Sequence, residues 1–176
     1  MKGMRCEQCG EVIGIRSGRV PRFCSSPCRQ KAYRGRCKAR GVLESVAGDC
    51  WARADGKRPI TVTGRPASST DPSTWSTFTE VQASSAGDGF GVMLGNGLAC
   101  YDLDHALTAG ELKPWARNVL DGIAEPILFA EVSVSGEGLH VFVEAPEGRG
   151  SRRAVGDGGV EFYSRGRFIR TTLTPF

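Results

Sequence analysis

The sequence predicts an α+β fold with a mixed or antiparallel sheet and packed helices, preceded by a small metal-stapled module. Strand and helix patterns are interspersed, and tight turns such as Gly95-Asn96-Gly97 join strand patterns directly, so the strands do not alternate strictly with helices. Four of the seven cysteines fall in two tight pairs near the N-terminus. A chain of 176 residues can hold one ordinary domain and a small appendage. We therefore expect two domains, residues 1–41 and 42–176.

Charge is distributed unevenly along the chain. Residues 1–40 hold 11 Lys and Arg against 2 acidic residues, whereas residues 41–176 hold 12 against 17. A basic arm on a mildly acidic body indicates a polyanionic partner, with a solvated basic face as the alternative. No stretch approaches the roughly 18 consecutive apolar residues of a membrane span, and the N-terminus lacks the apolar core of a signal peptide. We therefore expect a cytoplasmic protein without a membrane partner.

The N-terminal cysteines have the spacing of a zinc site. Cys6-Glu-Gln-Cys9 is followed after 14 residues by Cys24-Ser-Ser-Pro-Cys28, and four thiolates in this pattern can surround one structural Zn²⁺ tetrahedrally. The residues between the pairs are polar, basic and glycine-containing, which is typical of a hairpin. About forty residues could hardly bury enough core to fold without such a staple. The lack of a signal peptide argues against disulfides, so three further cysteines are interpreted as ordinary thiols: Cys37, Cys50 and Cys100.

A basic helix is predicted directly after the second cysteine pair. Ser26 is expected to cap it, Pro27 suits its first position, and Gly41 is expected to end it. The whole arrangement is treble-clef-like, and the segment "FCSSPCRQKAYR" resembles small bacterial zinc-binding modules. Docking of a protein is one role for this helix. We favour contact with nucleic-acid phosphates through its basic side chains, Arg29, Lys31, Arg34, Arg36 and Lys38.

The first half of the body contains one predicted helix and two predicted strands. Residues 41–70 are rich in turn formers and are predicted as a connector running into irregular structure. Asp71 and Pro72 open a predicted helix with an apolar face. That face consists of Trp75, Phe78 and Val81. Residues 89–104 are then predicted as two strands around the Gly-Asn-Gly turn.

The second half contains one predicted helix and four predicted strands. The capping box from Thr108 to Glu111 predicts a helix through residue 124, and a start at Lys113 is the alternative. Strands are expected around the turn "SGEG" and again near the C-terminus. Their ranges are 126–135, 139–145, 160–164 and 167–174. Residues 146–159 are predicted as a mobile basic loop by composition.

Two acidic side chains interrupt an apolar strand pattern in "LACYDLDHAL". Asp102 and Asp104 lie two residues apart, which places both side chains on one face of a strand with Cα atoms about 6.6 Å apart. Carboxylates placed in this way can converge on a pair of divalent ions, Mg²⁺ or Mn²⁺. Taken alone, the motif is a weak signal, because a solvated acidic pair at a strand end is common.

Residues further along the chain supply companions for this acidic pair. Gly136 and Gly138 precede His140, and glycines in such a turn let backbone N–H groups approach a phosphate. Glu161 lies in an apolar strand pattern and is a third candidate carboxylate. Arg167 follows closely and can neutralise triphosphate charge.

The ordered combination "DLDH … SGEGLHVFV … VEFYSRGRFI" resembles the archaeo-eukaryotic primase superfamily. It looks most like the phage and plasmid branch, the bifunctional DNA primase/polymerase (Prim-Pol) N-terminal domain, and the resemblance covers about residues 50–172. It implies a core like the RNA-recognition motif. It also implies template-directed nucleotidyl transfer by two metal ions, with single-stranded DNA and nucleoside triphosphates as partners.

The resemblance also implies a role for each matching residue. Asp102, Asp104 and Glu161 match the ligands of the catalytic divalent ions. His140 matches the residue that contacts the phosphates of the incoming nucleotide, and Arg167 is a further phosphate contact. The turn before the histidine is shaped by Ser135, Gly136 and Gly138.

Some features depart from the family pattern. Gly138 stands where superfamily members often have serine, and the chain runs "TTLTPF" where Prim-Pol sequences commonly end this strand in "TG". The helical accessory and helicase regions that usually follow are absent, so we expect a separately encoded helicase or accessory domain as a partner. Two alternatives remain: a non-catalytic zinc-containing DNA-binding module acting in recruitment or regulation, and a metal-dependent nuclease.

Overall fold

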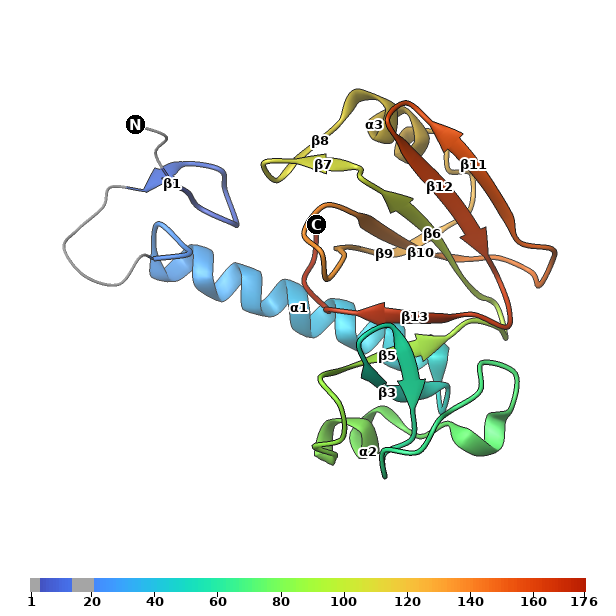
Figure 1. Ribbon diagram of the computed structural model, residues 1–176. Helices are drawn as coiled ribbons and strands as arrows, with labels where there is room; N and C mark the ends of the chain where they lie inside the picture. The colour runs from blue at the N-terminus through green and yellow to red at the C-terminus, as the bar shows by residue number, and fades with distance from the viewer. Residues whose placement is uncertain (1–3, 14–20) are drawn as a thin grey trace.

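Two antiparallel sheets form the body of the protein, as the computed structural model describes it for residues 4–13 and 21–176 (Figure 1). The larger sheet has the strand order β11 (Ser151–Val155), β12 (Gly158–Tyr163), β6 (Leu98–Asp104), β10 (Leu139–Glu144), β9 (Ile127–Val132). The smaller has the order β13 (Phe168–Thr171), β5 (Gly89–Met93), β3 (Trp51–Asp55), β4 (Arg58–Ile60). The predicted α+β class with an antiparallel sheet is confirmed.

The central strand β6 divides the apolar core in two because successive side chains of a strand point to opposite faces. The first core lies between the sheets and includes Leu43, Trp51, Val92, Leu98, Cys100, Phe129, Phe142 and Ile169. The second covers the opposite face of the larger sheet, against α3 (Pro114–Asp121), and includes Ala99, Leu103, Ala116, Leu139, Val141 and Val160. The even-numbered residues of β6 therefore face the smaller sheet.

Helix α1 (Ser26–Ala47) leads from the N-terminal arm to the base of the two sheets (Figure 1). Its cap is Ser25 rather than Ser26, and the predicted end at Gly41 is wrong, because the helix continues to Ala47. Packing explains the extra length, since Leu43 and Ala47 are buried in the first core and offset the cost of a helical glycine. The predicted domain boundary at residue 41 falls inside this helix, and the division stays a prediction. No helix in the described part of the chain is long and apolar enough to cross a membrane.

Two segments before β5 differ from their predictions. The connector predicted at residues 41–70 contains the hairpin of β3 and β4, which the turn-rich composition concealed. In place of one helix after Asp71, a short 3₁₀ turn (Pro72–Thr74) is followed by α2 (Phe78–Ala83). A new start is set at Thr77, whose side chain forms a capping box with Glu80. The predicted burial of Phe78 and Val81 is confirmed.

The Gly95-Asn96-Gly97 turn is present, but its two strands separate into different sheets. Gly95 and Leu98 exchange two backbone hydrogen bonds of 3.1 and 2.9 Å. Asn96 and Gly97 both have positive φ, the backbone conformation that an Asn-Gly pair favours. Beyond this single bridge, β5 joins the smaller sheet and β6 the larger one. The turn therefore links the two layers that enclose the first core.

Two further predictions fail around α3. The capping box predicted at Thr108 is instead a small hairpin of β7 (Leu107–Thr108) and β8 (Glu111–Leu112), because Ala109 and Gly110 turn the chain with positive φ. The alternative helix start, with Pro114 in the first turn after Lys113, is confirmed. The loop predicted at residues 146–159 contains β11, an exposed edge strand whose charged side chains the composition could not distinguish from a loop.

Candidate functional site

A row of polar side chains crosses the middle of the larger sheet. Asp102 on β6 pairs in register with His140 on β10 and with Glu161 on β12. One strand further out on each side, Glu131 on β9 pairs with His140, and Arg152 on β11 pairs with Glu161. Directly opposed residues of an antiparallel sheet project from the same face. The register therefore brings together three predicted site residues and adds two that were not predicted.

This row lies where the inner face of β6 leaves the apolar core. Cys100 is fully buried, Asp102 retains 25% side-chain exposure, and Asp104 is exposed. On the side of β12 and β11, the register places Gly159 and then Ala154 beside Asp104. These small residues border a hollow of about 310 Å³ that is also lined by Asp104 and Arg152. Asp104 therefore lies at the rim of an open space.

The three predicted carboxylates repel one another. Burial raises the pKa of Asp102, and the charges of Asp104 and Glu161 raise it further, against a lowering by His140. Glu161 is held by Arg152, 3.0 Å from its Oε1, and by Arg167, 3.5 Å from its Oε2. The three carboxylates supply the hard oxygen donors that Mg²⁺ and Mn²⁺ prefer, and the arginines beside them can bind phosphate. The set of side chains therefore fits a site shared by divalent ions and phosphates.

The carboxylate oxygens of the predicted site do not form a compact cluster of metal-ligating atoms. Among the residues that the structure describes, the cluster with at least three metal-ligating atoms all within 4.8 Å of one another consists of cysteines alone. A site in which each ion takes one or two carboxylates and substrate phosphates does not require such a cluster.

His140 is nearly buried and oriented by Glu131. Its exposure is 8%, its Nδ1 lies 2.9 Å from Oε1 of Glu131, and its Nε2 lies 3.7 Å from Oδ1 of Asp102. Burial alone would lower the pKa of His140, but the hydrogen bond to Glu131 and the nearby carboxylate charges outweigh it and raise the pKa. Sequence analysis missed Glu131. An acid inside the apolar strand pattern "ILFAEV" was the signal that could have found it.

The turn before His140 is closed by its own hydroxyl groups. Gly138 donates its N–H to Oγ of Ser133 at 3.1 Å, and a Cβ added at Gly138 would lie only 2.7 Å from that oxygen. Ser135 accepts from the N–H of Glu137 at 3.3 Å, and Gly136 turns the chain with a φ of 79°. The hydroxyl of Ser133 therefore fills the space that a larger residue at position 138 would need.

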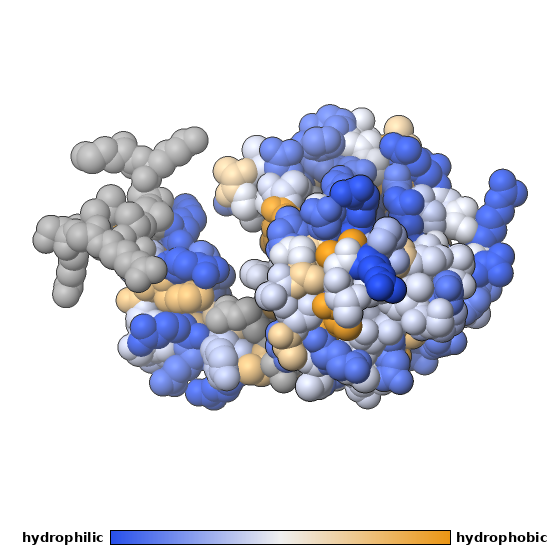
Figure 2. All heavy atoms as spheres, turned by 60° about the horizontal axis from the view of Figure 1, so that its bottom comes forward, coloured by the Kyte–Doolittle hydropathy of each residue, from blue (hydrophilic) through white to orange (hydrophobic). Residues whose placement is uncertain are grey.

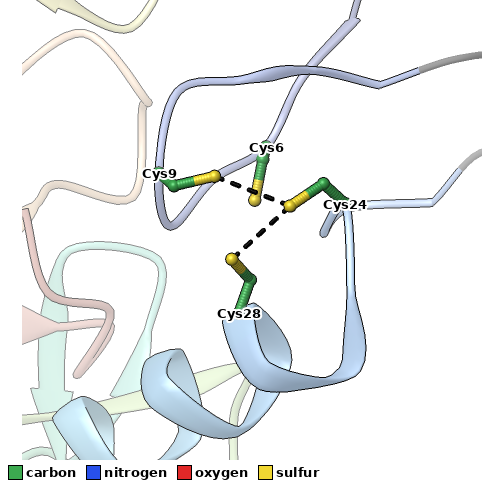
Figure 3. A group of neighbouring side chains, drawn as sticks. All are labelled: Cys6, Cys9, Cys24 and Cys28. Atoms are coloured by element: carbon green, nitrogen blue, oxygen red, sulfur yellow. Dashed lines mark hydrogen bonds between the residues drawn. The ribbon is translucent and has the colours of Figure 1, made fainter.

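The four N-terminal cysteines form a compact sulfur cluster (Figure 3). Cys6 and Cys9 lie between β1 (Met4–Arg5) and β2 (Val12–Ile13), and Cys24 and Cys28 lie at the start of α1. Their Sγ atoms all lie within 4.8 Å of one another. The Sγ of Cys24 is 3.6 Å from that of Cys9 and 3.5 Å from that of Cys28. A tetrahedron with metal–sulfur bonds of about 2.3 Å has sulfurs about 3.8 Å apart, so the cluster fits Zn²⁺.

Backbone hydrogen bonds favour the thiolate form of Cys6, whereas the pKa values of Cys9 and Cys24 are raised. Burial raises the pKa of Cys6, but hydrogen bonds with the backbone of Cys24, Gln8 and Cys9 outweigh it and lower the pKa to about 6. A thiolate is the form that binds metal. The hairpin predicted between the two cysteine pairs includes residues 14–20, which lie outside the described residues.

The basic residues of α1 are available to a partner. The helix exposes four of those predicted to bind nucleic acid, namely Arg29, Lys31, Arg34 and Lys38. The side chain of Arg36 lies outside the described residues. On the coloured part of the arm in Figure 2, hydrophilic side chains surround a smaller apolar patch.

An antiparallel sheet that presents carboxylates, a histidine and arginines on one open face defines a class of α+β domain suited to phosphate and divalent-cation binding. The chain belongs to the bifunctional DNA primase/polymerase (Prim-Pol) N-terminal family, whose model matches residues 27–175. It is also similar to the DNA Primase-polymerase of Nitratiruptor phage NrS-1, with 34% identity over 123 residues. That similarity covers 64% of this chain and spans only 17% of the length of the relative.

Proposed function

We propose that this protein is a DNA primase/polymerase of the phage or plasmid type, which performs template-directed nucleotidyl transfer on single-stranded DNA to initiate replication. The supporting observation is the register that sets Asp102 beside both His140 and Glu161 in a chain of the Prim-Pol family. A separately encoded helicase or accessory domain is the further partner that we expect.

In the proposed mechanism the carboxylates of the site bind metal ions, and the histidine and arginine bind the phosphates of the nucleotide. Asp102, Asp104 and Glu161 would hold Mg²⁺ or Mn²⁺, which when bound activates a 3′-hydroxyl and stabilises charge on the α-phosphate and pyrophosphate. His140 directs Nε2 toward this centre and would contact the triphosphate, within the turn shaped by Ser135, Gly136 and Gly138. Arg167, which lies 3.5 Å from Glu161, would bind phosphate oxygens.

In this proposal the N-terminal module holds the template. Zn²⁺ bound by Cys6, Cys9, Cys24 and Cys28 would have a structural role, because four cysteines leave no open coordination position for catalysis. The exposed basic side chains of α1 would contact the phosphates of single-stranded DNA.

Incorporation of labelled nucleotides by the full-length, zinc-loaded chain tests the proposed function. We expect metal-dependent extension on primed single-stranded DNA, and primer synthesis on unprimed DNA, with Mg²⁺ or Mn²⁺. Binding of single-stranded DNA without any incorporation would contradict the proposal and support the non-catalytic alternative. Metal-dependent degradation of DNA without added nucleotides would contradict it in favour of a nuclease.

Neutralising the basic side chains of α1 is expected to lower the affinity for single-stranded DNA and to make that affinity less dependent on salt concentration. The variant carries glutamine at Arg29, Lys31, Arg34 and Lys38. Each phosphate that a basic side chain neutralises on single-stranded DNA adds a slope of about −0.7 to log K against log salt concentration. The slope measured by fluorescence anisotropy should therefore become shallower by about 0.7 for each phosphate that the variant no longer binds. Glutamine at the exposed Arg65 and Arg117 is the control, and an equal change in slope for each charge removed in the two variants would contradict the assignment to α1.

A further inference from the structure

A fully buried carboxylate lies behind His140, and the mechanism proposed above does not use it. Glu131 is 0% exposed, and its Oε1 lies 2.9 Å from Nδ1 of His140. Burying a carboxylate is costly unless hydrogen bonds or charges compensate, so a carboxylate at this position requires dedicated partners.

The second oxygen of Glu131 is held by the last residue of β13 and the two residues that follow it. Its Oε2 accepts hydrogen bonds from the hydroxyl of Thr171 at 2.6 Å and from the N–H of Leu173 at 2.8 Å. It also accepts from the N–H of Thr172 at 3.0 Å, and it shares the hydroxyl hydrogen of Thr172, 3.2 Å away, with the carbonyl oxygen of Val132. Further along, the backbones of Pro175 and Glu131 form an isolated antiparallel β-bridge, so the chain beyond β13 runs beside β9 (Figure 1). Four donors on one oxygen fix the carboxylate firmly in place.

This arrangement determines which nitrogen of His140 carries a proton. Because the carboxylate of Glu131 accepts, Nδ1 of the ring must donate. The ring is then fixed with Nε2 on the side of Asp102, 3.7 Å from its Oδ1. The side chain of Phe142 packs edge-on against the imidazole, with ring centroids 6.3 Å apart. Glu131 and Phe142 therefore fix the orientation of the imidazole without a bound ligand.

We propose that Glu131 is a positioning residue for nucleotide binding, and that Thr171, Thr172 and Leu173 support it. Glu131 holds the imidazole of His140 by Nδ1 and presents Nε2 to the triphosphate. The sequence "TTL" at the end of β13 supplies the hydrogen-bond donors that make this buried carboxylate tenable. The inference rests on the proposed function, in which His140 contacts the nucleotide.

Glu131→Gln tests the proposal with little change in shape. The amide oxygen of the variant can retain the donors from residues 171–173, which turns the amide nitrogen toward His140. Nδ1 must then accept, and the ring proton moves to Nε2. The chain has only two histidines, so long-range ¹H–¹⁵N spectra contain two imidazoles, which a His105→Asn variant assigns. Because the pKa of His140 is raised, the spectra are recorded above it, at a pH where the ring ¹⁵N shifts no longer change. There we expect a protonated Nδ1 in the wild type and an unprotonated one in the variant.

The kinetic result is expected to separate binding from chemistry. Glu131→Gln should raise KM for the nucleotide by about tenfold or more, since hydrogen bonds to charged groups are among the stronger ones, with a smaller change in kcat. Glu125→Gln, which alters a carboxylate bonded to Tyr101, is the matched control and should leave both constants unchanged. If Glu131→Gln does not fold, Thr171→Val removes one donor at nearly constant volume and should raise KM in the same direction by a smaller factor.

Two results would overturn this proposal: an unprotonated Nδ1 in the wild-type protein, or a Glu131→Gln variant whose KM equals that of the wild type. A wild-type protein that incorporates no nucleotide would instead contradict the proposed function. The spectroscopic result would still decide whether Glu131 orients His140.

Discussion

Replacing Asp102 with asparagine is expected to lower the rate of nucleotide incorporation by about 10³-fold or more. Asp102 occupies the centre of the polar row, between His140 and Glu161, and it lies on the same face as Asp104. Metal ions contribute several kcal/mol of transition-state stabilisation to phosphoryl transfer, and about 1.4 kcal/mol corresponds to a factor of ten in rate. An amide of the same shape lacks the charge to hold the ions. The measurement is single-turnover extension of a labelled primer at saturating nucleotide.

The stability of Asp102→Asn provides an internal control. The pKa of Asp102 is raised in the folded protein, mainly by burial, so the ionised carboxylate destabilises the fold above its unfolded pKa. This destabilisation is complete once the pH exceeds the folded pKa and fades as the pH falls toward the unfolded value. In metal-free protein near neutral pH, the asparagine variant should therefore melt at the same temperature as the wild type or a higher one.

A matched carboxylate separates the site from general charge effects. Asp121→Asn removes an exposed acid at the end of α3 and should leave the incorporation rate unchanged. Retention of incorporation within tenfold in Asp102→Asn, with normal melting, would contradict the role assigned to Asp102.

The sequence predicts the site residues that share one face of a single strand, because side chains alternate between the two faces. Asp102 and Asp104 share a face because side chains of a strand repeat every second residue, and this period is visible in the sequence. The register between strands is not visible there. Glu131 and Arg152 come to the same row only through the pairing of β9 with β10 and of β11 with β12. Sequence analysis therefore found the centre of the row and missed both of its ends.

The fold could be predicted in class but not in several boundaries, because tertiary packing overrode local signals. Gly41 carries the sequence signal of a helix end, yet burial of Leu43 keeps α1 helical past it. Thr108 and Glu111 have the spacing of a capping box, yet they lie opposite each other in a hairpin. The strand β11 includes Arg152 and Arg153 and lies at an edge of the sheet, where the solvent exposure of side chains resembles that of a loop.

Removing metal from the cysteine cluster is expected to have the largest effect on stability, and this effect should be confined to the N-terminal module. In residues 5–13 and 21–28, only Cys6 and Ile13 are buried, so this part of the chain has almost no apolar core of its own. Structural Zn²⁺ sites contribute about 10–16 kcal/mol of apparent binding free energy, which is also folding free energy. The two-sheet body has separate cores and should keep its melting transition.

The variant Cys24→Ser tests this expectation, because the Sγ of Cys24 lies within 3.6 Å of two other sulfurs. We expect loss of bound zinc by metal analysis and rapid proteolysis before the middle of α1, while the body of the protein remains resistant. Cys37→Ser is the matched control, since Cys37 is an exposed thiol of the same helix outside the cluster. It should retain one zinc per chain and full protease resistance. A Cys24→Ser protein that keeps its zinc, or equal sensitivity of both variants to protease, would contradict a structural zinc site. Loss of the whole melting transition in Cys24→Ser would instead show that the module and the body fold as one unit, joined through the continuous helix α1.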